Sequence, residues 1–358
     1  MRIAHVVDSM EVGGAEVLVA QMCRRQRDLG HEPCVLAVAA LGEIGAQLQR
    51  EGFSVQANVG RHLSDAVPTF YRIFKSLRPD AVHLHNPTPT IYAALPAKLT
   101  GAAGIVSTRH SLVAPPHKIA EETKYAIASL FCDSIVGVSE ATTANLRAMH
   151  GIPLRKLVCV YNGVVPLIRA TKEECPPKHG FTLVYVGRLE PVKNHGLLFR
   201  AFRTALSSNP NLRLWMVGDG SERKALESLA GELDVTEQVT FWGHQSDVAP
   251  FFSCADTFVM SSKSEGLPLS LLQGFSLGVP AIVTDVGGMA EVVRLAKAGV
   301  TVSATDASDM AAAILKIAED DAGRRQYSGA AINAFQSLFS LDTMVNTYQD
   351  LYSKKKPA

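Results

Sequence analysis

The feature that most constrains the fold is an alternation of short apolar runs with longer helical stretches, which occurs twice along the chain. The runs are rich in Val and Ile, as expected for parallel strands buried on both faces. A break at residues 166–177, with three prolines and no periodicity, separates the two series. The pattern predicts an α/β protein with two doubly wound parallel-sheet domains.

The predicted strands of the first series are Ile3–Asp8, Pro33–Ala39, Ser54–Val59, Ala81–His85, Gly104–Thr108, Ser134–Val138 and Leu157–Tyr161. Those of the second series are Thr182–Gly187, Arg213–Val217, Val239–Trp242, Thr257–Met260, Ala281–Thr284 and Val300–Val302. A helix over Ala15–Leu29 follows the first strand, and the tail from Ala311 onward reads as helical. Two such domains in series are expected to form a ligand-binding cleft at the carboxyl ends of their strands.

Composition excludes several classes of protein. The chain has 358 residues with 35 basic and 34 acidic groups, which argues against a nucleic-acid binder that depends on phosphate neutralisation. Its six cysteines show no metal-ligand spacing, so we interpret them as buried reduced thiols of a cytosolic protein. No signal peptide and no membrane-spanning apolar run is evident. We expect a cytoplasmic protein, and the slightly basic first half leaves open a peripheral contact with the inner face of the membrane.

The segment Ser261–Phe275 is the most informative for chemistry. It follows a predicted strand and opens a helix, with Pro268 suited to the first turn. Unpaired N–H groups at a helix start bind phosphate. Glu265 lies before the helix and Gln273 about two turns in, roughly 12 Å apart at a helical rise. That distance suits one side chain on a sugar and the other on the ribose of a nucleotide sugar; an ordinary capped amphipathic helix explains the same pattern.

Two cations follow the first strand of the second series. Arg188 and Lys193 come directly after Gly187, which allows a ligand to approach the backbone. A guanidinium and an ammonium could grip a diphosphate and stabilise it as a leaving group. The alternative is a pair of solvated surface cations. His83 and His85 share one face of a predicted strand, but no third ligand is evident, so we predict no metal site.

Together these motifs resemble the retaining GT-B glycosyltransferases of family 4, the glycosyl transferases group 1. The matching segments, in chain order, are Gly13–Glu16, Val136–Glu140, Tyr161–Val164, Val217–Gly220, Ser264–Pro268 and Asp285–Glu291. The resemblance implies two Rossmann-like domains facing each other across a cleft: an acceptor domain at 1–165, a linker at 166–177 and a donor domain at 178–338. It also implies a C-terminal helix within 339–358 that crosses back to the first domain.

The resemblance assigns roles to individual residues. Catalytic residues are His110, Arg188, Lys193 and Glu265. Donor contacts are Gly14, Gly187, Gly218, Gly243, Gly266, Leu267 and Gln273, together with Arg188, Lys193 and Glu265. The acceptor side holds Gly13, Gly14 and His110. Gln273 stands where the family has a second glutamate, and it keeps a carbonyl acceptor for the ribose.

The expected activity is transfer of a sugar from a donor such as a UDP- or GDP-sugar, without a cofactor and without a metal because no Asp-rich motif is evident. The acceptor would be a sugar, a lipid-linked molecule or a small molecule in cell-surface polysaccharide or glycolipid assembly. Three alternatives stay open: a UDP-sugar epimerase, a phosphorylase, and a non-catalytic protein that binds nucleotide sugars. An NAD-dependent oxidoreductase ranks lower because no GxGxxG motif is present.

Overall fold

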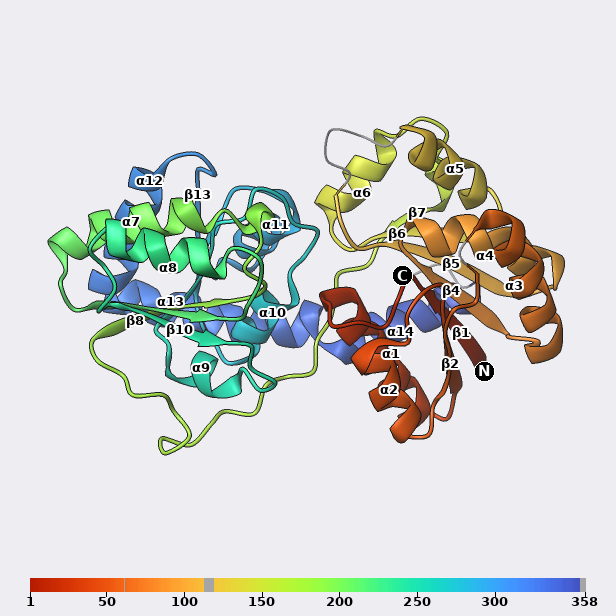
Figure 1. Ribbon diagram of the computed structural model, residues 1–358, viewed down its shortest axis with the longest axis horizontal. Coiled ribbons are helices and arrows are strands. Elements are labelled where there is room, and N and C mark those ends of the chain that lie inside the picture. Colours follow the sequence, from red (N-terminus) through yellow and green to blue (C-terminus); the bar gives the residue numbers. More distant parts are fainter. Residues whose placement is uncertain (61, 113–118, 355–358) are drawn as a thin grey trace. The chain divides into compact units, whose positions relative to one another are not determined.

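A computed structural model describes residues 1–60, 62–112 and 119–354. The chain divides into two compact units (Figure 1). Unit 1 comprises Met1–Val164 and Ser340–Ala358, and unit 2 comprises Val165–Phe339. Each unit contains one sheet in which all strands run parallel. The predicted fold class, two doubly wound parallel α/β sheets, is confirmed.

The sheet of unit 1 has the order β3-β2-β1-β4-β5-β6-β7. Its strands are β1 (Arg2–Val7), β2 (Glu32–Ala37), β3 (Ser54–Gln56), β4 (Ala81–His85), β5 (Gly104–Arg109), β6 (Ser134–Gly137) and β7 (Leu157–Cys159). The order changes direction between β1 and β4. In open α/β sheets, this is the point at which the carboxyl ends of the strands bind ligands.

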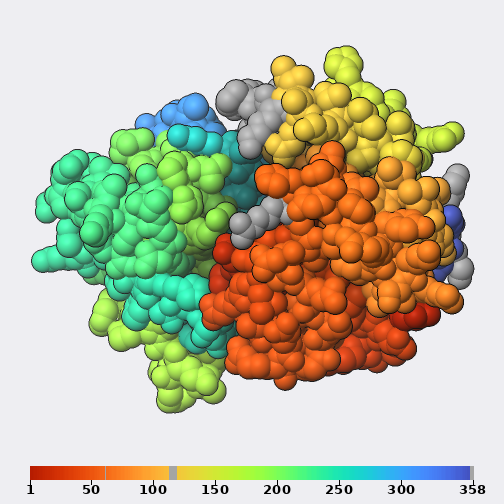
Figure 2. All heavy atoms as spheres, turned by 45° about the vertical axis from the view of Figure 1, so that its right-hand side comes forward, coloured from red at the N-terminus to blue at the C-terminus, as the bar shows by residue number. Residues whose placement is uncertain are grey.

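Helices cover both faces of this sheet. They are α1 (Gly14–Asp28), α2 (Gly42–Arg50), α3 (Leu63–Leu77), α4 (Pro87–Leu99), α5 (Ile119–Ser129), α6 (Glu140–Arg147), the short η1 (Leu154–Lys156) and α14 (Leu341–Tyr352). Figure 1 shows α1 and α2 on one face and α3 and α4 on the other. Figure 2 shows the outside of α3 and α4 in orange, and β4 is buried beneath its neighbours.

Helix α14 belongs to unit 1, although it is the last helix of the chain. It packs against α1 and β5 and buries Tyr348 and Tyr352. Residues 355–358 of the predicted C-terminal segment lie outside the described residues. The observed boundary between unit 2 and this segment falls after Phe339.

The sheet of unit 2 has the order β10-β9-β8-β11-β12-β13. Its strands are β8 (Phe181–Val186), β9 (Leu212–Val217), β10 (Val239–Gly243), β11 (Thr257–Met260), β12 (Ala281–Thr284) and β13 (Gly299–Val302). Its helices are the short η2 (Pro191–Lys193), α7 (His195–Ser208), α8 (Arg223–Glu232), α9 (Ala249–Cys254), α10 (Leu269–Ser276), α11 (Gly287–Ala296), α12 (Ala307–Glu319), α13 (Asp321–Ala334) and η3 (Phe335–Phe339). Figure 1 shows α7 and α8 on one face of this sheet and α9 on the other.

Each predicted strand is present in the structure. The largest difference in length is at β3, which ends at Gln56 rather than at Val59. Asn58 adopts a left-handed backbone with a φ of 56°, which an extended strand cannot include. The remaining strand ends are displaced slightly, as expected where terminal residues fray.

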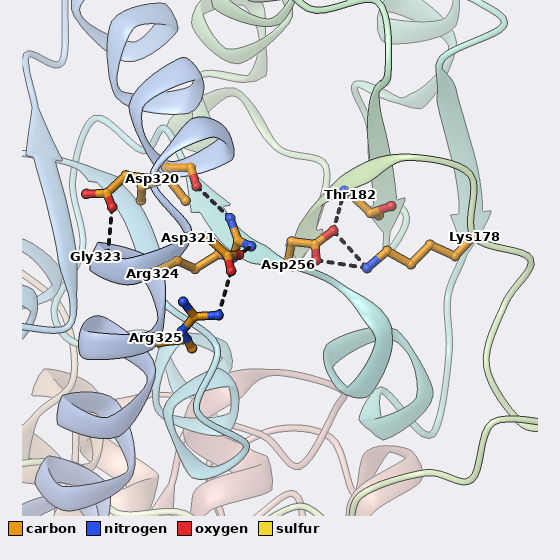
Figure 3. Close-up of polar contacts among 9 residues, drawn as sticks. Lys178, Thr182, Asp256, Asp320, Asp321, Gly323, Arg324 and Arg325 are labelled. Atoms are coloured by element: carbon orange, nitrogen blue, oxygen red, sulfur yellow. Dashed lines mark hydrogen bonds and ion pairs between the residues drawn. The ribbon is translucent and has the colours of Figure 1, made fainter.

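The predicted linker at 166–177 has no helix or strand, and it is bound along the surface of unit 2. The backbone N–H of Leu167 donates to Ser276 Oγ at 3.1 Å, and that of Ala170 donates to Ser253 Oγ at 2.9 Å. Beyond the linker, Asp256 pairs with Lys178 and accepts from the backbone of Thr182, as Figure 3 shows. These contacts hold the connecting chain at the amino end of β8.

The prediction of six reduced thiols was wrong for two cysteines. Cys175 in the linker and Cys254 at the end of α9 form a disulfide, with their Cα atoms 6.0 Å apart. The pair is separated by 79 positions, and it meets because the linker folds back onto α9. No local spacing motif could reveal it. Cys23, Cys34, Cys132 and Cys159 form no disulfide, as predicted.

Candidate active site

Three glycines meet at the carboxyl ends of neighbouring strands in unit 2. Gly187 follows β8, Gly218 follows β9 and Gly243 ends β10. The backbone N–H of Gly218 donates to the carbonyl of Gly243 at 2.8 Å, and a Cβ on Gly218 would lie 1.9 Å from the carbonyl oxygen of Gly187. Gly218 also has a φ of 133°, so both the backbone conformation and the lack of space exclude a side chain. The structure therefore brings these three predicted residues together.

Lys193 and Glu265 form an ion pair between Nζ and Oε1. Lys193 ends η2, just after β8, and Glu265 lies in the loop between β11 and α10. Their side chains are only 14% and 12% exposed. Because little water reaches them, removal of either partner would leave a poorly solvated charge. Two residues that the sequence placed in separate roles thus contact each other directly.

Serine hydroxyls hold the loop that carries Glu265. Ser262 Oγ donates to Glu265 Oε1 at 2.7 Å, and Ser261 Oγ donates to the backbone carbonyl of Lys193 at 2.9 Å. Thr284 at the end of β12 donates to the carbonyl of Ser262 at 2.6 Å. The sequence pattern predicted no role for these two serines. The one hint in the sequence was their place directly after a buried strand. In the structure Ser262 orients the carboxylate of Glu265, and Ser261 fixes the backbone of its partner Lys193.

Arg188 lies at the same edge, directly after Gly187. Its guanidinium is exposed and has no hydrogen bond or ion pair with another described residue. Its backbone carbonyl accepts a hydrogen bond of 2.9 Å from Tyr185 Oη. Burial, with a further contribution from the charge of Glu265, raises the pKa of Tyr185 well above its usual value, so the phenol keeps the proton that it donates. The backbone of Arg188 is fixed while its side chain stays available.

Helix α10 starts later than predicted. Pro268 is the N-cap, with extended backbone, and the first helical residue is Leu269. Gln273 is therefore little more than one turn into the helix, rather than two, and the helical rise does not describe its separation from Glu265. The prediction failed because the loop after β11 stays extended through Pro268, which disfavours a helical conformation in the residue before it. The side-chain amide of Gln273 is half-buried and hydrogen-bonds to no other described residue.

The predicted residues Gly266 and Leu267 lie between Glu265 and α10. The backbone N–H of Gly288, at the start of α11, donates to the carbonyl of Gly266 at 2.9 Å. Leu267 is 4% exposed and packs its side chain into the protein. The hydrogen bond to Gly266 and the buried side chain of Leu267 therefore fix the path of the loop. Any contact of Leu267 with a ligand would use its main chain.

In unit 1, the predicted residues Gly13 and Gly14 open helix α1. Gly13 is the N-cap, and a Cβ there would lie 2.2 Å from Oε2 of Glu16. Gly14 is exposed, and no atom would contact a Cβ placed on it. The carboxylate of Glu16 therefore lies over the start of its own helix, beside the solvent-exposed backbone of Gly14.

His110 follows β5 at the same edge of the unit 1 sheet. Its Nε2 lies 3.0 Å from Nδ1 of His85, and its backbone N–H donates to Asn86 Oδ1 at 3.2 Å. Burial of the ring lowers the pKa of His110 to about 4. The imidazole is therefore neutral near pH 7 and can both donate and accept a hydrogen bond.

The structure adds a third histidine that the sequence analysis missed. His5 on β1 lies beside His83 in the parallel register with β4, and nitrogens of His5, His83 and His85 lie within 4.8 Å of one another. The sequence shows a histidine in the first predicted strand. Only the strand order, which places β1 beside β4, reveals that His5 lies next to His83. Both nitrogens of His83 already lie 2.7 Å from hydroxyls, of Tyr352 and Thr108, and the His83 and His85 rings stack 4.0 Å apart. We therefore interpret the cluster as a hydrogen-bonding network.

Comparison with known protein families shows which family the chain belongs to. The model of the glycosyl transferases group 1 matches residues 170–334, and the model of glycosyltransferase family 4 matches residues 12–166. The chain belongs to the family 4 glycosyltransferases. The recognition from sequence motifs is thereby confirmed.

Two relatives of this family 4 protein are named for lipopolysaccharide core biosynthesis and for galactosyl transfer to a diphosphoundecaprenol-linked sugar. It is 31% identical over 189 residues to the lipopolysaccharide core biosynthesis glycosyltransferase LpsD of Rhizobium meliloti, a match that covers 53% of each chain. The chain thus spans about half the length of that relative. It is 23% identical over 313 residues to an Escherichia coli UDP-Gal:alpha-D-GlcNAc-diphosphoundecaprenol alpha-1,3-galactosyltransferase, covering 80% of this chain and 79% of the relative.

The fold matches a solved structure over almost its full length. Anabaena Alr3699/HepE in complex with UDP aligns with a TM-score of 0.86 at 18% identity, covering 99% of this chain and 100% of that one. At this identity the match establishes the GT-B fold. Within the residues that the structure describes, no helix has the length and apolar character to cross a membrane.

Proposed function

We propose that this chain is a retaining glycosyltransferase that moves a sugar from a nucleoside diphosphate sugar to an acceptor hydroxyl without a metal ion. The observation that carries the proposal is the arrangement at the carboxyl edge of unit 2. There, an exposed guanidinium (Arg188) and a fixed lysine–glutamate pair (Lys193 and Glu265) follow strands whose ends are glycine-rich. This unit is the part matched by the group 1 family model.

The leaving diphosphate would be held by the two cations. Arg188 is paired with none of the residues that the structure describes, and its guanidinium can bind two phosphate oxygens at once. Lys193 carries three N–H donors and uses one on Glu265, so it can bind a phosphate oxygen without breaking the ion pair. The N–H groups at the start of α10 add donors to the same anion. Together they would stabilise the charge that develops as the bond from C1 to the phosphate oxygen breaks.

Glu265 and His110 are assigned to the transferred sugar. Glu265 accepts from Ser262 and Lys193 through Oε1, and it would accept sugar hydroxyls with its remaining lone pairs. It orients the sugar, and we do not assign it as a covalent nucleophile. The neutral ring of His110 would hydrogen-bond the same sugar without adding charge.

The transfer step would proceed on one face of the sugar. The acceptor oxygen bonds to C1 on the side from which the diphosphate departs, and the acceptor proton passes to the departing phosphate oxygen. The products are a glycoside with retained configuration and a nucleoside diphosphate. No group on the protein then has to take up or release a proton overall.

The relatives suggest the substrate classes. The Escherichia coli relative is named for a UDP-galactose donor and a diphosphoundecaprenol acceptor, and LpsD is named for lipopolysaccharide core synthesis. We therefore propose a UDP-sugar as the donor, with a GDP-sugar next in order. The acceptor would be a sugar of a cell-surface polysaccharide or glycolipid, reached through a peripheral contact with a membrane surface.

A thermal-shift panel with UDP, GDP, ADP and NAD⁺ in EDTA tests the donor assignment. A ligand at one hundred times its Kd stabilises the folded protein by roughly 2.7 kcal/mol, which is easily measured. We expect one nucleoside diphosphate to stabilise the protein in EDTA; a response to NAD⁺ alone would contradict the proposal. Incubation of the matching UDP-sugar with and without acceptor then separates transfer from epimerisation, because an epimerase converts the donor alone.

A further inference from the structure

We propose that His5 and His85 are positioning residues that connect His110 to Gln26 through a chain of hydrogen-bonded imidazoles, so that the amide of Gln26 determines the tautomer of His110. The chain crosses four elements of unit 1. Its meaning for catalysis rests on the proposed contact of His110 with the transferred sugar, but the chain itself is a property of the protein alone.

The geometry of the chain is continuous. Gln26 Oε1 on α1 lies 2.8 Å from His5 Nε2 on β1. His5 Nδ1 lies 3.1 Å from His85 Nε2 at the end of β4, and His85 Nδ1 lies 3.0 Å from His110 Nε2 after β5. The rings of His85 and of its two neighbours are close to parallel, at 23° and 19°. Each distance is that of a normal hydrogen bond.

In a chain of neutral imidazoles, all the hydrogen bonds must run in the same direction. Each ring has one N–H donor and one acceptor nitrogen, so two rings that share a hydrogen bond have coupled tautomers. Gln26 Oε1 can only accept, which places the proton of His5 on Nε2. His5 Nδ1 then accepts from His85 Nε2, and His85 Nδ1 accepts from His110 Nε2. His110 is therefore left with Nδ1 as its lone-pair nitrogen, ready to accept from a sugar hydroxyl.

Burial keeps the rings of His5, His85 and His110 neutral, which a chain with one proton on each ring requires. Desolvation lowers the pKa of His5 and of His110 to about 4, and it lowers that of His85 well below its usual value. His5 and His85 are almost completely buried, and buried polar groups of this kind need fixed partners. A neutral chain satisfies the nitrogens of both rings without an unpaired buried charge.

The fourth histidine of the cluster lies outside the chain and supplies a control. His83 stacks on His85, but its nitrogens face the hydroxyls of Tyr352 and Thr108. Thr108→Val therefore removes a hydrogen bond from the same cluster without removing one from the chain. By contrast, Gln26→Leu removes the terminal acceptor at a position two rings away from His110.

The test is a two-bond ¹H–¹⁵N correlation spectrum of histidine-labelled protein, without substrates, at pH 7.5. We expect His110 protonated on Nε2 in the natural protein and in Thr108→Val. In Gln26→Leu, whose folding is checked by thermal unfolding, His110 should become a mixture of both tautomers. Protonation of His110 on Nδ1 in the natural protein would contradict the assigned direction even if the variant failed to fold. An unchanged His110 in folded Gln26→Leu would contradict the chain.

Kinetics then separate this inference from the proposed function. If the sugar contact holds, Gln26→Leu should lower kcat about tenfold with little change in the donor KM, because only a contact made by His110 is disturbed. A shifted tautomer with unchanged kcat would contradict the catalytic role of the chain. Absence of any transfer by the natural protein would count against the proposed function and leave the spectroscopic result intact.

Discussion

Nζ of Lys193 is ion-paired with Oε1 of Glu265, although the two residues are 72 positions apart and belong to loops after different strands. The contact exists because β8 and β11 are neighbours in the sheet, so their carboxyl ends open onto the same edge. The pair ties the orientation of the proposed sugar-binding carboxylate to that of a proposed phosphate-binding ammonium.

Lys193→Ala should lower kcat/KM by roughly 100- to 1,000-fold, the effect of removing a fixed charge that faces a leaving group. It should also reduce stability, because Glu265 becomes a largely buried unpaired carboxylate. A double-mutant cycle with Glu265→Ala should show a coupling of about 1–3 kcal/mol in urea unfolding. Lys224→Ala, an exposed lysine on α8, is the control. Additive effects of the two substitutions would contradict the ion pair.

Arg188→Ala should weaken nucleoside diphosphate binding by about 10- to 100-fold, because it removes one charge-assisted hydrogen-bonding contact. Stability should change little, because the guanidinium is exposed and pairs with no other described residue. Calorimetric titration with UDP in EDTA measures the first effect and thermal unfolding the second. Arg200→Ala on the exposed side of α7 serves as the matched control. Equal affinity in both variants would argue against the diphosphate contact.

Gln273→Glu should change UDP affinity by less than about tenfold, because both side chains present a carbonyl-type acceptor to a ribose hydroxyl. Gln273→Leu keeps a similar size but removes the acceptor, so it should weaken UDP binding by about tenfold. The same titration measures both variants. If Gln273→Leu binds UDP as tightly as the natural protein, the ribose assignment is wrong.

Reduction of the Cys175–Cys254 disulfide should lower the stability of unit 2 by about 2–4 kcal/mol, since a closed loop of 79 positions restricts the unfolded chain. Thermal unfolding of Cys175→Ser, compared with the natural protein with and without reductant, measures this. UDP binding should be unchanged, because Cys254 precedes β11 and the proposed donor site follows the carboxyl ends of the strands. Sensitivity of Cys175→Ser to reductant would show that another cysteine pair contributes.

Stability should fall as the pH drops from about 6.5 towards 4. His5 has a pKa of about 4 in the folded protein and 6.5 as a model group, so the unfolded chain binds its proton first. That difference corresponds to about 3 kcal/mol for His5 alone, lost progressively through this window. His83, His85 and His110 act in the same direction. Urea unfolding at pH 7.5, 6 and 5 gives the slope.

Replacement of the exposed His244 by Gln should leave this slope unchanged. An equal free energy of unfolding at pH 5 and pH 7.5 would mean that the buried histidines are not neutral in the folded protein. The sign of the slope is thus a test of the burial that the imidazole chain requires.

Much of the fold could be predicted from the sequence because its signals are local. Buried parallel strands leave short apolar runs, and each run here matched a strand. The errors also had local causes that the pattern did not contain, namely the left-handed backbone at Asn58 and the extended loop up to Pro268. The resemblance to family 4 rested on short motifs of fixed residue types, and the family models confirmed it.

The sequence by itself therefore determined the fold class, the family and the residue types of the candidate site. Only the tertiary structure decided which of them touch: Lys193 with Glu265, His5 with His85, and Cys175 with Cys254. Neighbours in a doubly wound sheet are set by the strand order, which places β1 beside β4 and β8 beside β11. Residues far apart in the chain come within hydrogen-bond distance through that order, and spacing along the sequence carries no record of it.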